Sequence, residues 1–178
     1  MTLQYQNITI RNAGVSDANQ LAVWWNDGAV MSHAGFPLGL GTTPEKVASE
    51  LATDCDSQRR RLILLLKDLP IGEMCYRILE DGSADIGIKI CESTHQEKGI
   101  GRKALSMLIG ALFDMGCPKI VLDTSLKNLR AQHVYETLGF RKLRVNINSW
   151  KNQLGQWESS VDYALTEDDF IDFTKESN

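Results

Sequence analysis

Six residues, Gln96-Glu97-Lys98-Gly99-Ile100-Gly101, have the types and spacing of a loop that binds a pyrophosphate. They lie between a strand-like run, Ala84 to Cys91, and a strongly amphipathic segment, Arg102 to Met115. The start of a helix leaves about four backbone amides without internal acceptors, and the helix dipole makes that end positive. The two glycines have no Cβ, so a ligand can approach the backbone closely. Further positive charge comes from Lys98, Arg102 and Lys103.

A second pattern follows, Asn128-x-x-Ala131-x-x-x-Tyr135-Glu136-x-x-Gly139-Phe140. We expect a helix from Asn128 to Leu138, because Gly139 stands where a left-handed residue favours a helix end. On such a helix Asn128, Ala131 and Tyr135 share one face. An amide and a phenol would therefore face the same side.

The elements that must position these residues form a mixed α/β pattern. Strands are predicted near Ile8 to Ile10 and at 62–67, 71–79, 84–91, 119–124, 140–150 and 157–165. Helices are predicted after Ser16-Asp17, from Thr43 to about Asp54, at 102–115 and at 128–138. The span 28–43 should be mostly irregular, and the acidic tail from Thr166 should fray.

The strands at 62–67, 71–79 and 84–91 are predicted to form an antiparallel meander, because only short turns separate them. The next unit is a strand, a helix and a strand. Such a crossover makes the strands at 84–91 and 119–124 parallel. The glycine loop then lies at the carboxyl end of the first strand, where sheets of this kind bind ligands.

Composition narrows the function classes. A chain of 178 residues is expected to form a single domain over residues 1–178, and its net charge of −4 argues against a general nucleic-acid binder. The cysteines and histidines are scattered, so no metal site is expected. No apolar run reaches about 18 residues and no signal peptide is recognisable, so we expect a cytoplasmic protein without a membrane partner.

Together the patterns Gln-x-x-Gly-x-Gly and Asn-x-x-Ala-x-x-x-Tyr-Glu-x-x-Gly-Phe resemble the GNAT family of N-acetyltransferases, specifically over residues 84–140. The start of the chain and its closing hairpin look most like the ribosomal-protein N-terminal and aminoglycoside acetyltransferases. The resemblance implies a central mixed sheet with an antiparallel meander, one parallel strand pair splayed around acetyl-CoA, and helices on both faces.

The resemblance also implies where acetyl-CoA binds, with no metal involved. The pantetheine arm would run along the strand and contact Asn128, and the pyrophosphate would bind the amides of the glycine loop. The co-substrate residues implied in this way are Ile88, Lys89, Ile90, Cys91, Gln96, Glu97, Lys98, Gly99, Ile100, Gly101, Arg102, Lys103, Asn128 and Ala131.

The family's general acid matches Tyr135. Its phenol, with an ordinary pKa of about 10, would protonate a thiolate of pKa about 8.5 at a cost of roughly 2 kcal/mol, so hydrogen bonding competes with full transfer. Asp123 is the first candidate for the general base, because some ribosomal-protein alanine acetyltransferases have a glutamate five residues before the asparagine. Glu73 is the alternative base.

The family's acceptor site matches the early helix and the loop after it, with Trp24, Trp25, Asp27, His33 and Phe36. Aromatic walls with a carboxylate suit a cationic amine, although the two tryptophans are as well explained as core residues. We therefore expect direct acetyl transfer from acetyl-CoA to a primary amine of a small molecule or a protein N-terminus. The sequence leaves the acceptor, and a homodimer, open.

Two other functions compete. Gly99, Gly101 and Ala104 also fit the dinucleotide fingerprint G-x-G-x-x-G/A, with Asp123 about 20 residues on as the ribose-binding acid. That fingerprint requires its first glycine directly after the strand, whereas Glu92 to Lys98 intervene here. The other competitor is a CoA-binding regulator without catalysis.

Overall fold

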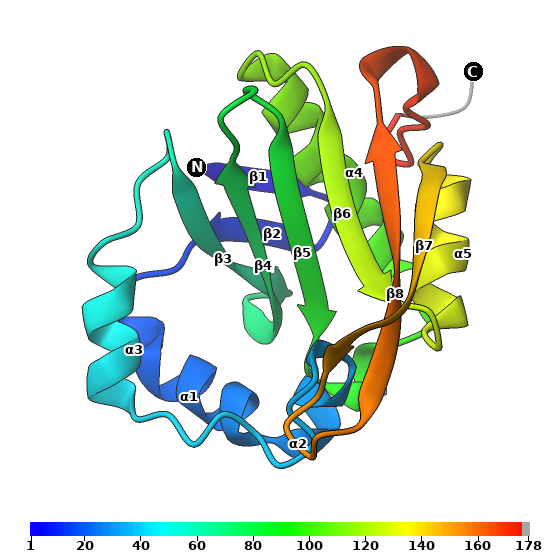
Figure 1. Ribbon diagram of the computed structural model, residues 1–178. Coiled ribbons are helices and arrows are strands. Elements are labelled where there is room, and N and C mark those ends of the chain that lie inside the picture. Colours follow the sequence, from blue (N-terminus) through cyan, green and yellow to red (C-terminus); the bar gives the residue numbers. More distant parts are fainter. Residues whose placement is uncertain (176–178) are drawn as a thin grey trace.

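The computed structural model describes residues 1–175, which form one eight-stranded sheet flanked by helices (Figure 1). The strands lie in the order β1-β2-β3-β4-β5-β6-β8-β7. Their bounds are β1 Thr2–Tyr5, β2 Ile8–Asn12, β3 Arg59–Leu66, β4 Leu69–Ile78, β5 Ala84–Ile90, β6 Ile120–Ser125, β7 Arg141–Lys151 and β8 Trp157–Leu165. The α-helices are α1 Ala18–Asn26, α2 Gly28–Met31, α3 Pro44–Leu51, α4 Ile100–Asp114 and α5 Leu129–Thr137.

The register agrees with the predicted topology. Strands β3, β4 and β5 form an antiparallel meander, and α4 then crosses over so that β6 runs parallel to β5. The pairing of β5 with β6 is short, with Ala84 opposite Ile120 and Asp85 opposite Val121. Beyond these pairs the two strands diverge.

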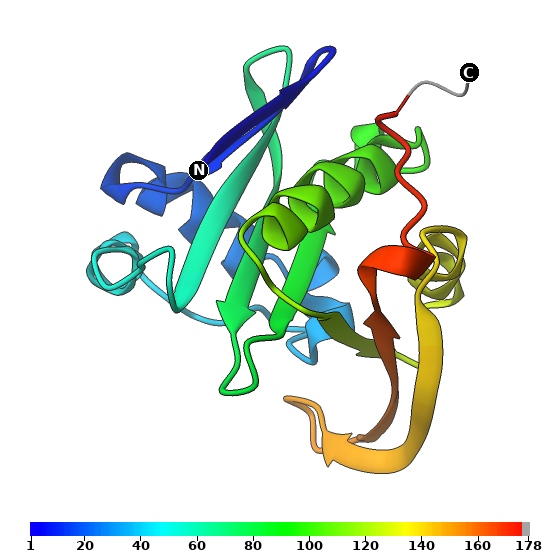
Figure 2. The same cartoon turned by 90° about the horizontal axis from the view of Figure 1, so that it is seen from above.

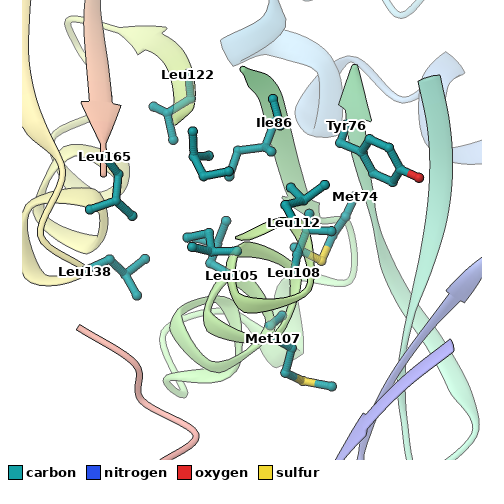
Figure 3. Packing of buried hydrophobic residues seen from close by; sticks show 14 of the residues in the cluster. Met74, Tyr76, Ile86, Leu105, Met107, Leu108, Leu112, Leu122, Leu138 and Leu165 are labelled. Carbon is teal, nitrogen blue, oxygen red and sulfur yellow. The ribbon is translucent and has the colours of Figure 1, made fainter. Parts of the chain in front are cut away.

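Helices cover both faces of the sheet. On one face α4 and α5 pack on a large core, in which Leu105, Leu108 and Leu112 of α4 lie beside Ile86 and Leu122 of the sheet (Figure 3). On the other face α1 and α3 cover β3 and the end of β5 with a smaller core. The mixed α/β fold with helices on both faces is therefore confirmed.

Three regions differ from the sequence-based prediction. An additional strand, β1, pairs with β2, and the segment expected to be irregular contains α2 and a 3-10 turn, Ser32–Ala34. The tail does not fray within the described residues. Phe170 and Phe173 pack against the larger core, and this anchors the segment from Thr166 to Lys175.

Among residues 1–175, none of the helices is both long and apolar enough to cross a membrane. The same part of the chain contains no group of three or more His, Cys, Asp or Glu side chains that could hold a metal ion.

Candidate functional site

A cleft of about 800 Å³ opens where β5 and β6 diverge. Its size falls in the range of small-molecule sites. Its walls come from both strands, from the first turn of α4, from α5, from β7 and from residues 29–34. The predicted splayed strand pair thus produces a continuous cavity through the sheet.

The edge of β5 that faces this cleft carries free backbone groups. The N–H of Ala84 donates to Lys119 on the β6 side, whereas that of Cys91 donates to Ile71 on the β4 side. Backbone groups alternate in direction along a strand, so those of Ile88 and Ile90 face the cleft. The Ile90 carbonyl already accepts a hydrogen bond from Gln96 Nε2 at 2.8 Å.

The glycine loop ends in an exposed helix start. Gly99 is the N-cap of α4 and has a φ of 74°, a left-handed conformation that glycine adopts without steric cost. The backbone amides of Ile100, Gly101 and Arg102 find no acceptor within residues 1–175. Three donors at the positive end of a fifteen-residue helix can satisfy an anionic ligand.

The structure separates the predicted co-substrate residues into two groups. Those lining the cleft are Ile88, Lys89, Ile90, Gln96, Glu97, Gly99, Gly101, Arg102, Asn128 and Ala131. The side chain of Asn128 caps α5, because its Oδ1 accepts from the Ala131 amide at 3.2 Å. Its Nδ2 has no acceptor in the described chain and can still donate into the cleft.

Four predicted co-substrate residues do not line the cleft. Cys91 is buried against α1, and Ile100 points into the larger core. Lys98 is exposed on the loop. Lys103 turns toward the N-terminal hairpin, where its Nζ donates to Gln6 Oε1 at 3.1 Å and lies 5.7 Å from the Tyr5 ring. Its charge is therefore directed away from the glycine loop.

Tyr135 reaches the cleft from the face of the sheet covered by α4 and α5. Its ring packs against Phe140 and Tyr163, with centroids 5.8 and 5.9 Å away. Burial, with smaller contributions from Asp123 and Cys75, raises the pKa of the phenol to about 12. The group is thus protonated at neutral pH, and giving its proton fully to a thiolate of pKa about 8.5 would cost about 5 kcal/mol.

Asp123 points to the opposite face, because its neighbours Ile120 and Leu122 fill the larger core. Its carboxylate lies in the open part of the cleft and has no hydrogen-bond donor among residues 1–175. Partial removal from water raises the pKa of this carboxyl, and the negative charges of Asp85 and Asp162 raise the pKa further. A carboxylate without a fixed partner and with a raised pKa is suited to accept a proton.

Glu73 does not line the cleft. It is buried on β4 opposite Lys89, and its Oε1 accepts a hydrogen bond from Lys89 Nζ at 2.9 Å. Because this ion pair already occupies the carboxylate, Glu73 is poorly placed to act as a base. The nearby Cys91 thiol has a pKa raised to about 12 by burial and by Glu73, which does not suit a nucleophile.

Most of the predicted acceptor residues lie outside the cleft. Trp24 and Trp25 are both core residues, because α1 packs with α3 and β3 in the smaller core. The Trp24 indole donates to Glu92 Oε1 at 3.0 Å. Asp27 caps α2 by accepting from the Ala29 amide, and Phe36 lies outside the cleft lining. These four residues therefore lie outside the cleft, and their assignment to the acceptor site stays a prediction.

His33 does line the cleft, two residues before a clasp that the sequence did not indicate. The turn between β7 and β8 brings Gln153 to the segment after α2, where its backbone N–H donates to the Gly35 carbonyl at 2.8 Å. Its side chain bonds to Leu38 N–H and to the Gly39 carbonyl, both at 2.9 Å. Figure 1 shows this hairpin tip beside α2.

Trp150 is a lining residue that sequence reasoning missed. It comes from β7, and its ring lies against Gly35, so that it forms a wall of the cleft near His33. No local pattern marks it, because only the long-range contact between the two loops brings it to the cleft. Arg130 and His133 were also missed, although both lie on the α5 turns that carry Asn128 and Tyr135.

The dinucleotide-binding alternative does not fit this geometry. β5 ends at Ile90, and a separate 3-10 turn, Ser93–His95, precedes Gly99. The chain therefore lacks the tight strand-to-helix turn that this fingerprint builds.

Comparisons with known proteins agree with the geometry. The family described as "Acetyltransferase (GNAT) domain" matches residues 7–141. N-alpha-acetyltransferase 30 of Dictyostelium discoideum is 30% identical over 69 residues, which is 39% of this chain and 36% of that relative. The match thus spans little more than a third of the relative's length.

Two solved structures have the same fold. The Vibrio cholerae spermidine N-acetyltransferase in complex with CoA and spermine is 21% identical, with a TM-score of 0.80 over 92% of this chain and 97% of that one. The ribosomal-protein-S5-alanine acetyltransferase of Vibrio fischeri is 20% identical, with a TM-score of 0.76 over 96% and 99%. Because the family match covers most of the sequence, this chain belongs to the GNAT family of acyl-CoA-dependent N-acetyltransferases.

Proposed function

We propose that this chain transfers an acetyl group from acetyl-CoA to a primary amine by direct attack, with both substrates bound together. One observation carries the proposal. A single cleft joins the free backbone edge of β5, the amides that begin α4, the Tyr135 phenol and the Asp123 carboxylate. Two substrates can meet in that cleft from opposite faces of the sheet.

The residues fit acetyl-CoA, which supplies the reactive thioester. Backbone groups of Ile88 and Ile90 offer a strand edge to the amide-containing pantetheine arm, and Asn128 Nδ2 offers one further donor. The amides of Gly101 and its neighbours, together with Arg102, suit the phosphates. These donors supply the recognition that the family's co-substrate requires.

The catalytic roles follow from the two sides of the cleft. The attacking amine gives up a proton, and Asp123 takes it, directly or through a water, because its carboxylate is free on the acceptor side. The Ile90 N–H donates a hydrogen bond to the thioester carbonyl oxygen, which becomes negatively charged during the attack. The Tyr135 hydroxyl donates a hydrogen bond to the departing thiolate, and its raised pKa keeps the proton on the phenol.

We infer that the acceptor is a cationic amine. Asp123 lines the cleft and has no ion-pair partner among residues 1–175, whereas Asp85 and Asp162, on the same face of the neighbouring strands, are paired with Arg77 and Arg144. The free Asp123 carboxylate favours a positively charged amine. Protein N-termini and small polyamines both satisfy this requirement, and the relatives named above include enzymes for each class.

An acetyl-CoA consumption screen tests the proposal. Peptides with free α-amines, aminoglycosides, polyamines and small metabolite amines would be compared, and mass spectrometry would locate the acetyl group on the product. We expect turnover with at least one class, and calorimetry should detect acetyl-CoA binding in the absence of NAD binding. Binding of acetyl-CoA without turnover on any class would favour a CoA-binding regulator, and NAD binding alone would end the proposal.

A further inference from the structure

The C-terminal segment, Thr166 to Lys175, runs along α4 on the face of the sheet that carries the larger core. Figure 2 shows it in red, between α4 and α5. Its N-terminal half is anchored away from the cleft. The N–H of Ile171 donates to the Leu138 carbonyl at 3.0 Å, and the Phe170 ring lies 5.9 Å from that of Phe113, near the end of α4.

Its second half reaches the beginning of α4. The N–H of Phe173 donates to Ser106 Oγ at 3.0 Å, and Ser106 is a buried serine on the second turn of the helix. One turn earlier, the guanidinium carbon of Arg102 lies 4.3 Å from the centroid of the Phe173 ring. This is a close cation–π contact.

Arg102 is also a wall of the co-substrate cleft. Within residues 1–175 its guanidinium has neither a hydrogen-bond acceptor nor an ion-pair partner. The next cation on the helix, Lys103, is directed to Gln6. The face of the Arg102 guanidinium is therefore held by the ring, while its N–H donors are free for an anion.

We propose that the C-terminal segment is part of the co-substrate site and that Phe173 is a positioning residue for Arg102. The inference rests on the proposed function, because the anion is taken to be a phosphate of acetyl-CoA. An arginine that is already held in place loses less conformational freedom when it binds its ligand. Removal of the ring would therefore weaken acetyl-CoA binding without touching the reacting atoms.

The test uses the full chain and acetyl-CoA itself. Phe173→Leu should weaken acetyl-CoA binding, measured by calorimetry, about two- to fivefold, as expected if a cation–π contact worth about 0.5–1 kcal/mol is lost. The turnover number at saturating acetyl-CoA should not change. Phe173→Tyr, which keeps an aromatic ring at this position, should bind acetyl-CoA as tightly as the unmodified chain. Phe170→Leu is the matched control, since it removes a similar ring from the same segment but away from the cleft, and it should leave the affinity unchanged.

A double-mutant cycle separates positioning from general loosening. In an Arg102→Gln background, Phe173→Leu should have no further effect on acetyl-CoA binding. An additive loss, an effect of Phe170→Leu as large as that of Phe173→Leu, or unchanged affinity in Phe173→Leu would overturn the inference while the proposed function stands. Absence of acetyl-CoA binding by the unmodified chain would overturn both.

Discussion

Tyr135 and Asp123 approach the cleft from opposite faces of the sheet, which is the arrangement that a transfer between two substrates needs. The phenol lies among the aromatic rings beneath α5, whereas the carboxylate lies on the open side near residues 29–34. In the proposed reaction, the hydrogen-bond donor for the leaving thiolate and the acceptor of the amine proton would therefore lie on opposite sides of the sheet.

Replacing Tyr135 by phenylalanine should lower the turnover number about 10- to 150-fold, because hydrogen bonds to charged groups contribute about 1.5–3 kcal/mol. Acetyl-CoA affinity should change little, since the phenol meets only the departing sulfur. Steady-state kinetics and calorimetry measure the two effects. Tyr163→Phe is the control, because its hydroxyl donates to Glu136, at 2.8 Å, and does not line the cleft. Equal turnover numbers in Tyr135→Phe and Tyr163→Phe would show that Tyr135 does not stabilise the leaving thiolate.

Asp123→Asn should abolish most turnover near neutral pH and, at the same time, raise the thermal midpoint. The folded-state pKa of this carboxyl lies above its ordinary value. Its ionised form therefore costs stability once the pH exceeds that ordinary value, and asparagine removes the cost. Activity assays across pH, combined with thermal unfolding, measure both effects.

Glu73→Gln provides the contrast. It leaves Lys89 without its carboxylate partner, so the thermal midpoint should fall. If this variant, rather than Asp123→Asn, removed the rise in activity with pH, the general base would be Glu73.

At the scale of elements, the clasp between the β7–β8 turn and residues 35–39 lies beside His33 and Trp150, which line the cleft where the proposed function places the amine. Gln153→Ala removes both side-chain hydrogen bonds of the clasp. We expect the KM for the amine to rise several-fold, while acetyl-CoA affinity stays the same. Gln156→Ala is the control, because within residues 1–175 Gln156 forms hydrogen bonds only inside its own turn. A change in acetyl-CoA affinity with an unchanged KM for the amine would contradict this prediction, because the clasp would then act on acetyl-CoA binding.

The anchoring of the C-terminal segment depends on Gly139, which has a φ of 97° and no space for a Cβ because the Asp169 carbonyl lies there. Gly139→Ala should lower the free energy of unfolding by more than about 1 kcal/mol. Gly110→Ala, in the middle of α4 with open space around its Cα, should instead raise it by about 0.5–1 kcal/mol. Urea denaturation distinguishes the two, and equal effects would contradict the steric argument.

Local pattern predicted most of the elements, because the meander, the crossover and α5 each depend on short turns and near-neighbour periodicity. Strand β1 was missed because four residues give too little alternation. The C-terminal segment was misjudged from its charge, since Phe170 and Phe173 find their partners only on α4.

The part of the site that local motifs fix was also predictable from the sequence. Tyr135, Asn128 and the glycine loop reach the cleft because local motifs fix them on known elements. The end of the cleft near Trp150 was not predictable. Trp150 and Gln153 meet residues 35–39 across more than 100 positions of sequence, and a single sequence carries no sign of such a contact.

At the scale of the whole molecule, charge should select the acceptor. The chain carries a net charge of −4, and the Asp123 carboxylate in the cleft has no ion-pair partner among residues 1–175. For a polycationic amine, kcat/KM at saturating acetyl-CoA should fall as salt rises from about 0.05 to 0.5 M, because the Debye length shrinks from above 10 Å to below about 5 Å. A matched neutral amine should show little change. An increase for the polycation would contradict the proposed acceptor class.

The short pairing of β5 with β6 also has a mechanical consequence. Two residue pairs join the halves of the sheet, while α4 packs beneath both halves and acts as a common spine. Within the sheet, a change in the angle between the halves disturbs only these two pairs, and outside it the Gln153 clasp would have to move as well. We therefore expect the width of the cleft between β5 and β6 to vary more easily than any other dimension of the protein. Amines of different size would then be accommodated by a change in the angle between the halves of the sheet, without repacking of the core.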